Sequence, residues 1–199
     1  MFTGIVQAVG RIAVTQDRAR ARRLTIEAKR AFRGSKIGDS IAVSGVCLTA
    51  VQITADRFVA DVSAETLKMT TAGKWRVGTR VNLEKALTPA TPLGGHLVSG
   101  HVDGVGKVIS IGREGASRRL RIENPRALSR YVARKGSVCV DGVSLTVNEV
   151  SRNSFDLMII PHTLQHTTLG SLEVGAVVNL EVDLIARYLE RLIAAKDLK

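Results

Sequence analysis

The strongest constraint in this sequence is that it contains one pattern twice. Ser40–Thr49 matches Ser137–Thr146 at a shift of 97 residues, with six of ten residues identical. Val77–Leu87 matches Val174–Leu184 at the same shift, with seven of eleven identical. Solenoid units have periods of roughly 20–50 residues, so a period this long indicates a duplicated domain instead.

The segment between the two copies is typical of a linker. Residues 88–98 contain two prolines and a glycine pair, which interrupt regular structure. The chain of 199 residues is therefore divided into a first domain at 1–87, a linker at 88–98 and a second domain at 99–184. Residues 185–199 form a separate tail.

Each copy has short segments rich in Val, Ile, Thr and Leu, separated by turns that contain Gly, Asp and Arg. A spacing of about ten residues is typical of an all-β barrel or sandwich. The Val-Asn-Leu-Glu segments at 81–84 and 178–181 predict strands whose side chains alternate between inside and outside. Short helical turns are expected at Ser63–Leu67 and Pro161–Leu164, where proline suits a first turn.

The tail predicts an amphipathic helix that the first copy lacks. Its apolar residues recur at the spacing of one helix face, with Arg187, Glu190, Arg191 and Lys196 on the other. An apolar stripe must be buried, either on the chain's own barrel or against copies of the same helix in an oligomer. The stripe consists of Ile185, Tyr188, Leu189, Leu192 and Ile193.

Composition excludes several classes of protein. No window reaches the roughly 18 apolar residues of a membrane helix, and the N-terminus does not resemble a signal peptide, so we expect a soluble, cytoplasmic protein with no membrane partner. Cys47 and Cys139 are the only cysteines, too few for a disulfide framework. The four histidines show no ligand spacing with them, so no metal site is expected.

The charge of +11 is concentrated in the first copy. Residues 1–87 hold 15 basic and 7 acidic side chains, and residues 11–36 alone carry nine basic residues against Asp17 and Glu27. This excess is either a solvated basic face or a patch for nucleic acid or another anionic ligand. With only 4% aromatic residues, the chain lacks a row of stacking platforms for bases.

Small polar residues recur at the same places in both copies, and this predicts two similar pockets. Gly4-Ile5-Val6 corresponds to Gly100-His101-Val102, and Cys47-Leu48-Thr49 corresponds to Ser144-Leu145-Thr146. A single threonine in a strand is ordinary β structure. Together, glycines that admit a ligand to the backbone and hydroxyl groups beside them favour binding of a flat polar heterocycle. No catalytic triad, phosphate-binding loop or dinucleotide motif accompanies them.

The copies also differ, because Cys47 stands opposite Ser144 and Ile5 opposite His101. A lone cysteine in a strand is more often a buried thiol than a nucleophile, and a lone histidine is more often structural. The differences nevertheless suggest two pockets that bind alike and act differently.

Four segments together resemble riboflavin synthase of the alpha-chain type, and the resemblance covers nearly the whole chain. They are Met1-Phe2-Thr3-Gly4-Ile5-Val6, the long run Leu93-Gly94-Gly95-His96-Leu97-Val98-Ser99-Gly100-His101-Val102, Asp141-Gly142-Val143-Ser144-Leu145-Thr146, and Pro161-His162-Thr163-Leu164 followed by Thr167-Thr168-Leu169-Gly170.

The resemblance implies two tandem six-stranded antiparallel Greek-key β-barrels, each binding one 6,7-dimethyl-8-ribityllumazine. Transfer of a four-carbon unit between two such molecules would give riboflavin and 5-amino-6-ribitylaminouracil, the last step of riboflavin biosynthesis. The family uses no metal or organic cofactor. It implies a homotrimer built through the C-terminal helix, with each active site between barrels of neighbouring chains, and leaves association with lumazine synthase open.

The resemblance also implies the residues that contact the substrate. In the first copy they are Gly4, Ile5, Val6, Cys47, Leu48, Thr49, Asp61, Val62, Ser63, Ala64, Glu65 and Thr66, and in the second copy Gly100, His101, Val102, Lys135, Ser144, Leu145, Thr146, Met158, Ile159, Ile160, Pro161, His162 and Thr163. Ser44 stands where the family often has Asn, and Ser63-Ala64 where it often has Met-Pro.

Cys47, His101 and Ser144 are the candidate catalytic residues. The reaction requires a proton to leave the acidic methyl group on C7 of the donor ring, and we expect His101 or a nearby hydroxyl group to assist. Cys47 would contact the ring or act as a transient nucleophile. Two alternatives remain: a lumazine- or flavin-binding antenna protein of the same fold that binds without reacting, and a nucleic-acid-binding barrel.

Overall fold

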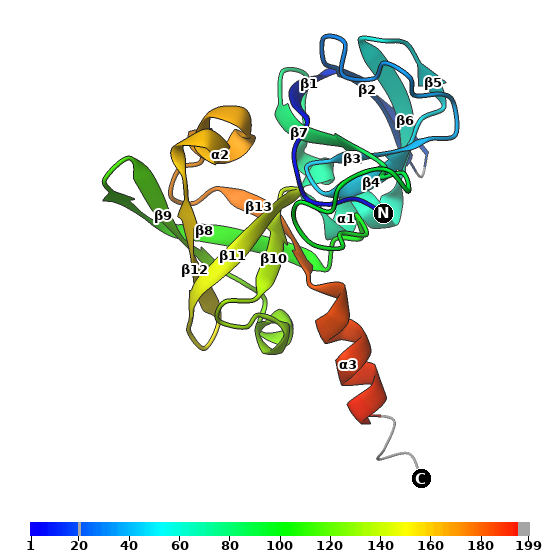
Figure 1. Ribbon diagram of the computed structural model, residues 1–199. Helices are drawn as coiled ribbons and strands as arrows, with labels where there is room; N and C mark the ends of the chain where they lie inside the picture. The colour runs from blue at the N-terminus through cyan, green and yellow to red at the C-terminus, as the bar shows by residue number, and fades with distance from the viewer. Residues whose placement is uncertain (20, 195–199) are drawn as a thin grey trace.

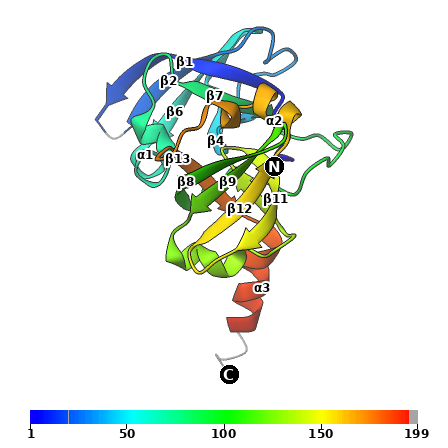
Figure 2. The same cartoon turned by 90° about the vertical axis from the view of Figure 1, so that its left-hand side faces the viewer.

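The computed structural model describes residues 1–19 and 21–194 as two β-barrels followed by one helix (Figure 1). The first sheet has the strand order β4-β3-β7-β1-β2-β6-β5, and the second is a closed barrel ordered β10-β11-β12-β9-β8-β13. All strand pairs are antiparallel, so the predicted all-β class is confirmed. Figure 2 shows the two barrels from the side.

The first barrel comprises β1 (Ala8–Arg18), β2 (Ala21–Glu27), β3 (Ser40–Val43), β4 (Val46–Thr49), β5 (Gln52–Ile53), β6 (Arg57–Ser63) and β7 (Arg80–Lys85), with α1 (Ala64–Met69) and the 3-10 helix η1 (Thr71–Lys74) between β6 and β7.

The second comprises β8 (Gly104–Glu114), β9 (Ser117–Glu123), β10 (Ser137–Val140), β11 (Val143–Val150), β12 (Ser154–Ile159) and β13 (Val177–Val182), with η2 (Arg126–Tyr131), α2 (Pro161–His166) and η3 (Thr168–Ser171).

The first sheet has seven strands in place of the predicted six because one strand is interrupted. Continuous β11 of the second barrel corresponds to β4 and β5, which are separated at Ala50 and Val51. The Ala50 N–H continues the pairing of β3 with β4 by donating to the Asp39 carbonyl at 3.0 Å, and the Val51 N–H pairs with β6 by donating to the Val59 carbonyl at 2.8 Å. The interrupted segment therefore joins β3 to β6, as β11 joins β10 to β12.

Each barrel has its own core. Phe58, Leu24 and Ile26 are fully buried in the first core, where Phe58 and Phe32 meet edge to face with ring centroids 5.0 Å apart. Phe155 and Leu120 lie at the centre of the second core. Because apolar side chains alternate along the strands, one face of each sheet fills its own barrel.

The side chains of the Val-Asn-Leu-Glu strands alternate as predicted, yet all four residues are buried in both copies. Val81 and Leu83 fill the first core, while Asn82 and Glu84 point to the opposite side. That side is not solvent but the junction with the other barrel. In sequence, polar residues at a domain junction are indistinguishable from polar residues that face water.

The junction is nearly symmetric. The Asn82 amide accepts a hydrogen bond from the Thr168 N–H and donates to the Asp141 carbonyl, both at 2.8 Å. Asn179, its counterpart, accepts from the Thr71 N–H and donates to the Ser44 carbonyl, again both at 2.8 Å. Each barrel therefore uses equivalent residues to bind the other, as the two subunits of a dimer with a two-fold axis do.

Two tight turns touch at the centre of this junction. Ser44-Gly45 and Asp141-Gly142 all have positive φ, and a Cβ placed on Gly45 would lie 2.9 Å from the Gly142 nitrogen. The reciprocal distance, from a Cβ on Gly142 to the Gly45 nitrogen, is 2.7 Å. Glycine is needed at both positions because any side chain would push the barrels apart.

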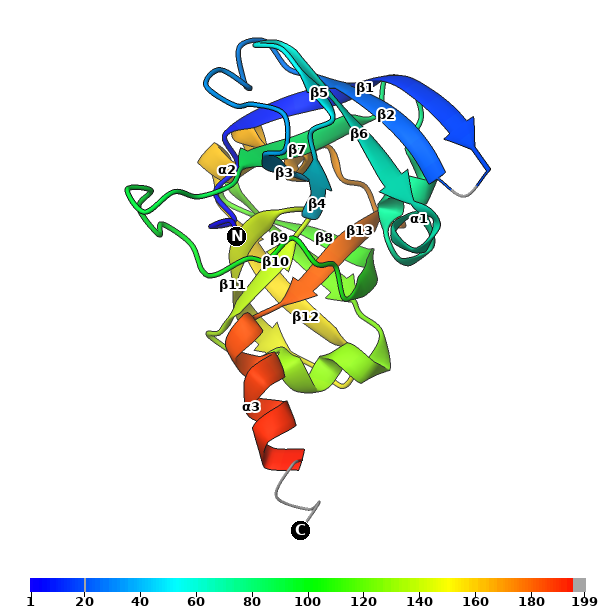
Figure 3. The same cartoon turned by 90° about the vertical axis from the view of Figure 1, so that its right-hand side faces the viewer.

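The predicted tail helix is present as α3 (Leu184–Ala194), which extends away from both barrels (Figures 1 and 3). Residues 195–199 of the prediction, Lys196 included, lie outside the described residues. Its polar side is tied to the second barrel, because Glu190 pairs with Arg130 and Tyr131 and Arg187 pairs with Asp103.

In the described part of the chain, no helix has both the length and the apolar character that crossing a membrane requires.

Candidate active site

The segments Gly4–Val6 and Gly100–Val102 are exchanged between the barrels. The Ser144 N–H of the second barrel donates to the Gly4 carbonyl at 2.8 Å, and the Cys47 N–H of the first donates to the Gly100 carbonyl at 2.9 Å. Val6 packs against the second core and Val102 against the first. Each predicted pocket is therefore completed by a segment from the other repeat.

This exchange corrects the predicted grouping, in which each copy supplied its own pocket. The structure places Cys47-Leu48-Thr49 beside Gly100-His101-Val102, and Ser144-Leu145-Thr146 beside Gly4-Ile5-Val6, and these two groupings are the first and second candidate pockets. The repeat in sequence shows which residues correspond to each other. It does not show which barrel a corresponding segment approaches.

A buried glutamate holds each exchanged segment. One oxygen of the Glu84 carboxylate accepts from the Thr3 N–H and hydroxyl, both at 2.7 Å, and the other accepts from the Gly4 N–H at 3.0 Å. Glu181 accepts from Ser99 and Gly100 in the same way, at 2.6, 2.6 and 2.9 Å. Burial raises the pKa of both glutamates, although these hydrogen bonds act in the opposite direction.

Glycine is required where the segments cross. Gly4 and Gly100 have φ of 75° and 78°, and a Cβ on Gly4 would lie 2.6 Å from the Ser144 Cβ. A Cβ on Gly100 would lie 2.7 Å from the Cys47 Cβ. Any other residue would therefore separate the segment from the strand that it meets.

In the first pocket, Cys47 is half-buried on β4 and Thr49 is exposed. Where β6 meets α1, the Ser63 hydroxyl accepts from the Thr66 N–H at 3.1 Å and lies 3.0 Å from the Thr66 hydroxyl. This is a normal N-cap, so the turn forms without the family's Met-Pro. His101 is exposed beside Gly100, and its N–H donates to the Ser99 hydroxyl at 3.3 Å.

In the second pocket, the Ser144 hydroxyl lies 2.7 Å from Nδ1 of His96. His96 is 8% exposed, and its Nε2 has no hydrogen-bond partner among the described residues. Burial lowers the pKa of His96, an effect that the charge of Asp183 partly opposes. The imidazole is therefore mostly neutral at pH 7 and able to accept the Ser144 proton.

His96 was not predicted as a functional residue. It belongs to the linker, outside both copies of the repeat, so no corresponding residue drew attention to it. The only signal was its place in the Leu93–Val102 run.

Other predicted site residues occupy more ordinary positions. The Asp61 carboxylate is paired with Arg23 at 2.6 and 2.7 Å, which lowers its pKa, so its side chain is committed to an ion pair. Lys135 has a φ of 65° and is exposed. His162 stacks on His166 at 4.2 Å between ring centroids. The remaining residues follow β6 and β12 into the helical turns: Val62, Ala64 and Glu65 in the first repeat, and Met158, Ile159, Ile160, Pro161 and Thr163 in the second.

Among residues 1–19 and 21–194, no three His, Cys, Asp or Glu side chains gather closely enough to hold a metal ion.

Comparison with known proteins agrees with this geometry. The lumazine binding domain family model matches residues 3–86 and again residues 99–183. Riboflavin synthase from Photobacterium phosphoreum is 48% identical over 97% of this chain and 89% of its own length. Riboflavin synthase from Mycobacterium tuberculosis is 47% identical over 96% of this chain and 98% of its own length.

Solved structures of LumP bound to riboflavin and to 6,7-dimethyl-8-(1'-D-ribityl) lumazine are 28% identical, with TM-scores of 0.85 and 0.82. Both cover 92% of this chain and 99% of LumP. Two copies of the lumazine binding domain, with full-length relatives at this identity, place the chain in the riboflavin synthase family of transferases.

Proposed function

We propose that this chain converts two molecules of 6,7-dimethyl-8-ribityllumazine into riboflavin and 5-amino-6-ribitylaminouracil. The observation that carries the proposal is the pair of equivalent candidate pockets, each with a Leu-Thr segment, a crossing glycine segment and a short helical turn. A reaction between two copies of one molecule matches a protein with two copies of one pocket. Fixing both rings in reactive orientation is worth roughly 7–11 kcal/mol.

Binding of each pteridine would use the 25 predicted contact residues, regrouped by the exchange. Ser63 and Thr66 offer hydroxyl groups beside the first pocket, and Ser144 and Thr146 beside the second. The backbone groups of Gly4 and Gly100 are open to a ligand because no side chain covers them. Hydrogen-bond donors at the carbonyl edge of the ring would stabilise the anion that forms on loss of the C7 methyl proton.

We assign proton transfer in the second pocket to Ser144 and His96. The Ser144 hydroxyl oxygen takes the proton from the C7 methyl group and at the same time gives its own proton to neutral His96. After the carbon–carbon bond has formed, His96 returns a proton through Ser144. Cys47 and His101 would serve the first pocket, Cys47 contacting the ring or adding to it transiently. The two pockets therefore differ in the groups beside otherwise similar binding surfaces.

A homotrimer is the proposed assembly. Every residue of the apolar stripe on α3 is exposed, from 55% at Leu189 to 68% at Ile185. The alternative, burial of this stripe on the chain's own barrel, does not occur, because α3 contacts the barrel through its polar side. Ile5 and Ile160, both predicted substrate contacts, are also about half exposed, which suits a site closed by a neighbouring chain.

We also propose that the protein is located in the cytoplasm and that it associates with lumazine synthase. Cys47 and Cys139 are both free thiols, which is typical of a reducing compartment.

The decisive experiment mixes the purified chain with 6,7-dimethyl-8-ribityllumazine and follows riboflavin by its absorbance and fluorescence. We expect one riboflavin for every two lumazines consumed, and titration with an unreactive lumazine analogue should saturate at two sites per chain. LumP structures hold such ligands bound, so binding without turnover is the second candidate function. Saturation at one site, or binding with no riboflavin formed, would reject the proposed reaction.

A further inference from the structure

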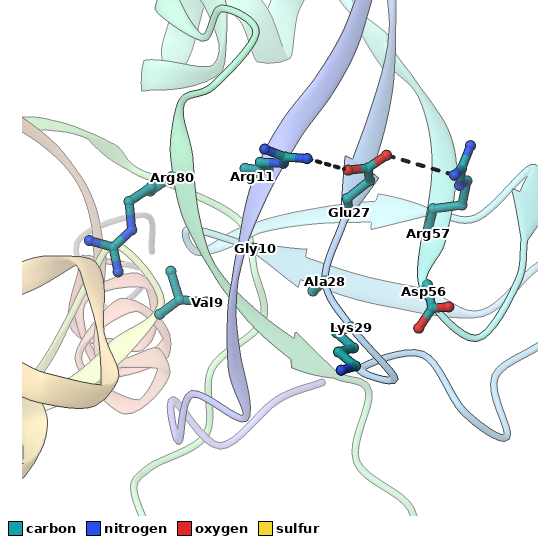
Figure 4. A pocket seen from close by; sticks show the side chains of 9 residues that line it. All are labelled: Val9, Gly10, Arg11, Glu27, Ala28, Lys29, Asp56, Arg57 and Arg80. Carbon is teal, nitrogen blue, oxygen red and sulfur yellow. Dashed lines mark hydrogen bonds and ion pairs between the residues drawn. The ribbon is translucent and has the colours of Figure 1, made fainter.

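A second hollow lies on the first barrel, among residues that the pteridine pockets do not use. It has a volume of about 580 Å³ and is partly open to solvent (Figure 4). Four of its side chains are basic and two are acidic, and none is aromatic. The lining consists of Val9, Gly10, Arg11, Glu27, Ala28, Lys29, Asp56, Arg57 and Arg80.

The acidic side chains leave part of the positive charge unbalanced. Glu27 is shared between two cations, at 3.0 Å from Arg11 and 3.8 Å from Arg57. Asp56 accepts the Arg30 N–H at 2.7 Å. Within the described residues, no carboxylate lies within 4.0 Å of Lys29 or Arg80. Figure 4 shows the four basic side chains on four separate segments, with Arg11, Arg57 and Lys29 near Glu27 and Ala28, and Arg80 beside Val9 on the other side of Gly10.

The second repeat provides an internal comparison, because strand register fixes the equivalent positions. Arg57 pairs with Glu27 as Ser154 pairs with Glu123, and Arg80 pairs with Arg11 as Val177 pairs with Lys107. Lys29 corresponds to Pro125. Three of the four cations are therefore specific to the first barrel.

The segment that follows also differs between the repeats. In the second barrel η2 (Arg126–Tyr131) begins directly after Pro125, whereas in the described part of the first barrel no helix follows Lys29 before β3. Neither the barrel fold nor the duplicated pocket thus requires the basic hollow.

We propose that this hollow binds a small molecule carrying a phosphate or pyrophosphate group. Arginine forks hold phosphate oxygens through paired charged hydrogen bonds, and lysine adds a point charge. Two more basic than acidic side chains match one phosphate dianion. The volume is in the range of about 300–1,000 Å³ typical of small-ligand pockets. Nucleic acid fits less well, because the lining offers no aromatic surface for bases.

The test is calorimetric titration of the full-length protein with inorganic pyrophosphate at low ionic strength. We expect one site per chain. The double variant R57S/R80V carries the residues of the second repeat and should bind about tenfold more weakly or worse. Because both residues lie outside the pteridine pockets, its riboflavin formation should equal that of the wild type, which also verifies folding.

The matched control is R113S/R152S, which removes the same charge from exposed positions of the second barrel and should retain pyrophosphate affinity. Absence of binding by the wild type would overturn the proposal, as would equal weakening in both double variants, which would show a general charge effect. Tighter binding of a single-stranded RNA of about 20 nucleotides, lost in R57S/R80V, would assign the hollow to a polymer instead. If R57S/R80V does not fold, the pyrophosphate affinities of the single variants R57S and R80V are compared with that of the wild type, and each should be weaker.

Discussion

At the scale of single residues, His96 is the proposed base of the second pocket, where its Nδ1 lies 2.7 Å from the Ser144 hydroxyl. Replacing it by Gln in H96Q keeps a polar side chain but removes the base that faces Ser144. We expect kcat to fall roughly a hundredfold with little change in KM, since general base catalysis contributes on this order. Steady-state kinetics of riboflavin formation will measure this effect.

The pH profile separates a base from a merely structural histidine. Because burial lowers the pKa of His96, its neutral form dominates at pH 7, and the wild-type rate should drop as the pH falls through that pKa. H96Q should lack this acidic limb, whereas H166Q, a change in an exposed histidine, should keep it. An unchanged profile in H96Q would remove the assigned role.

Asp141 is the second residue with a distinct expectation. Burial raises its pKa to about 7, although the Asn179 N–H donates to it at 2.8 Å and acts in the opposite direction. The folded state thus binds this proton more tightly than the unfolded state. Stability should therefore decrease as the pH rises from near 4 to above 7, by at most about 4 kcal/mol.

The variant D141N removes the ionisable group and keeps an oxygen that can accept from the Asn179 N–H. Urea unfolding at several pH values should show a clearly flatter dependence for D141N than for the wild type, with the largest gain in stability above pH 7. The two proteins must be compared by the slope of their unfolding free energy against pH, because Glu84 and Glu181 also have raised pKa values and lower the stability in the same direction. Parallel curves would mean that Asp141 does not titrate in this range.

At the scale of elements, α3 presents a polar side to its own barrel and an apolar side to solvent. A charge at Leu192, which is 67% exposed, costs little in the isolated chain but would be buried unpaired in a helix-mediated oligomer. Light scattering should give about three chain masses for the wild type and one for L192E. The control R191E, on the polar side, should keep the wild-type mass. An oligomer that survives in L192E would exclude α3 as the contact.

The four residues of each Val-Asn-Leu-Glu strand have three structural roles. Val81 and Leu83 fill the core, Asn82 bonds to the other barrel, and Glu84 holds the segment that crosses to the second pocket. The segment recurs at 178–181 because its duplicate performs the same three tasks at the other side of the junction.

At the scale of the whole molecule, the reciprocal use of Asn82 and Asn179 predicts equal costs of removal. Each amide makes two hydrogen bonds across the junction, so N82A and N179A should each lower the free energy of unfolding by about 2–4 kcal/mol. Urea unfolding should give values within about 1 kcal/mol of each other. The exposed N153A should have almost no effect. A large cost at one site and none at the other would contradict a symmetric junction.

The sequence by itself determined the duplication, the all-β class, the correspondence between segments of the two repeats and the amphipathic tail. Each of these features is visible in the sequence as a repeat or as a periodic pattern of apolar residues, so it can be predicted without knowledge of distant contacts. The short helical turns that begin at Ala64 and Pro161 were also recognisable, since a helix start depends on residues a few positions apart.

Only the tertiary structure decided that the glycine segments exchange barrels, that His96 from the linker meets Ser144, and that four first-repeat cations line one hollow. The physical reason is common to all three. These contacts join residues that are distant in sequence, and they exist because two barrels meet along one nearly symmetric junction or because strands pair in one register. Such a juxtaposition leaves no periodic trace in the chain, whereas core burial does.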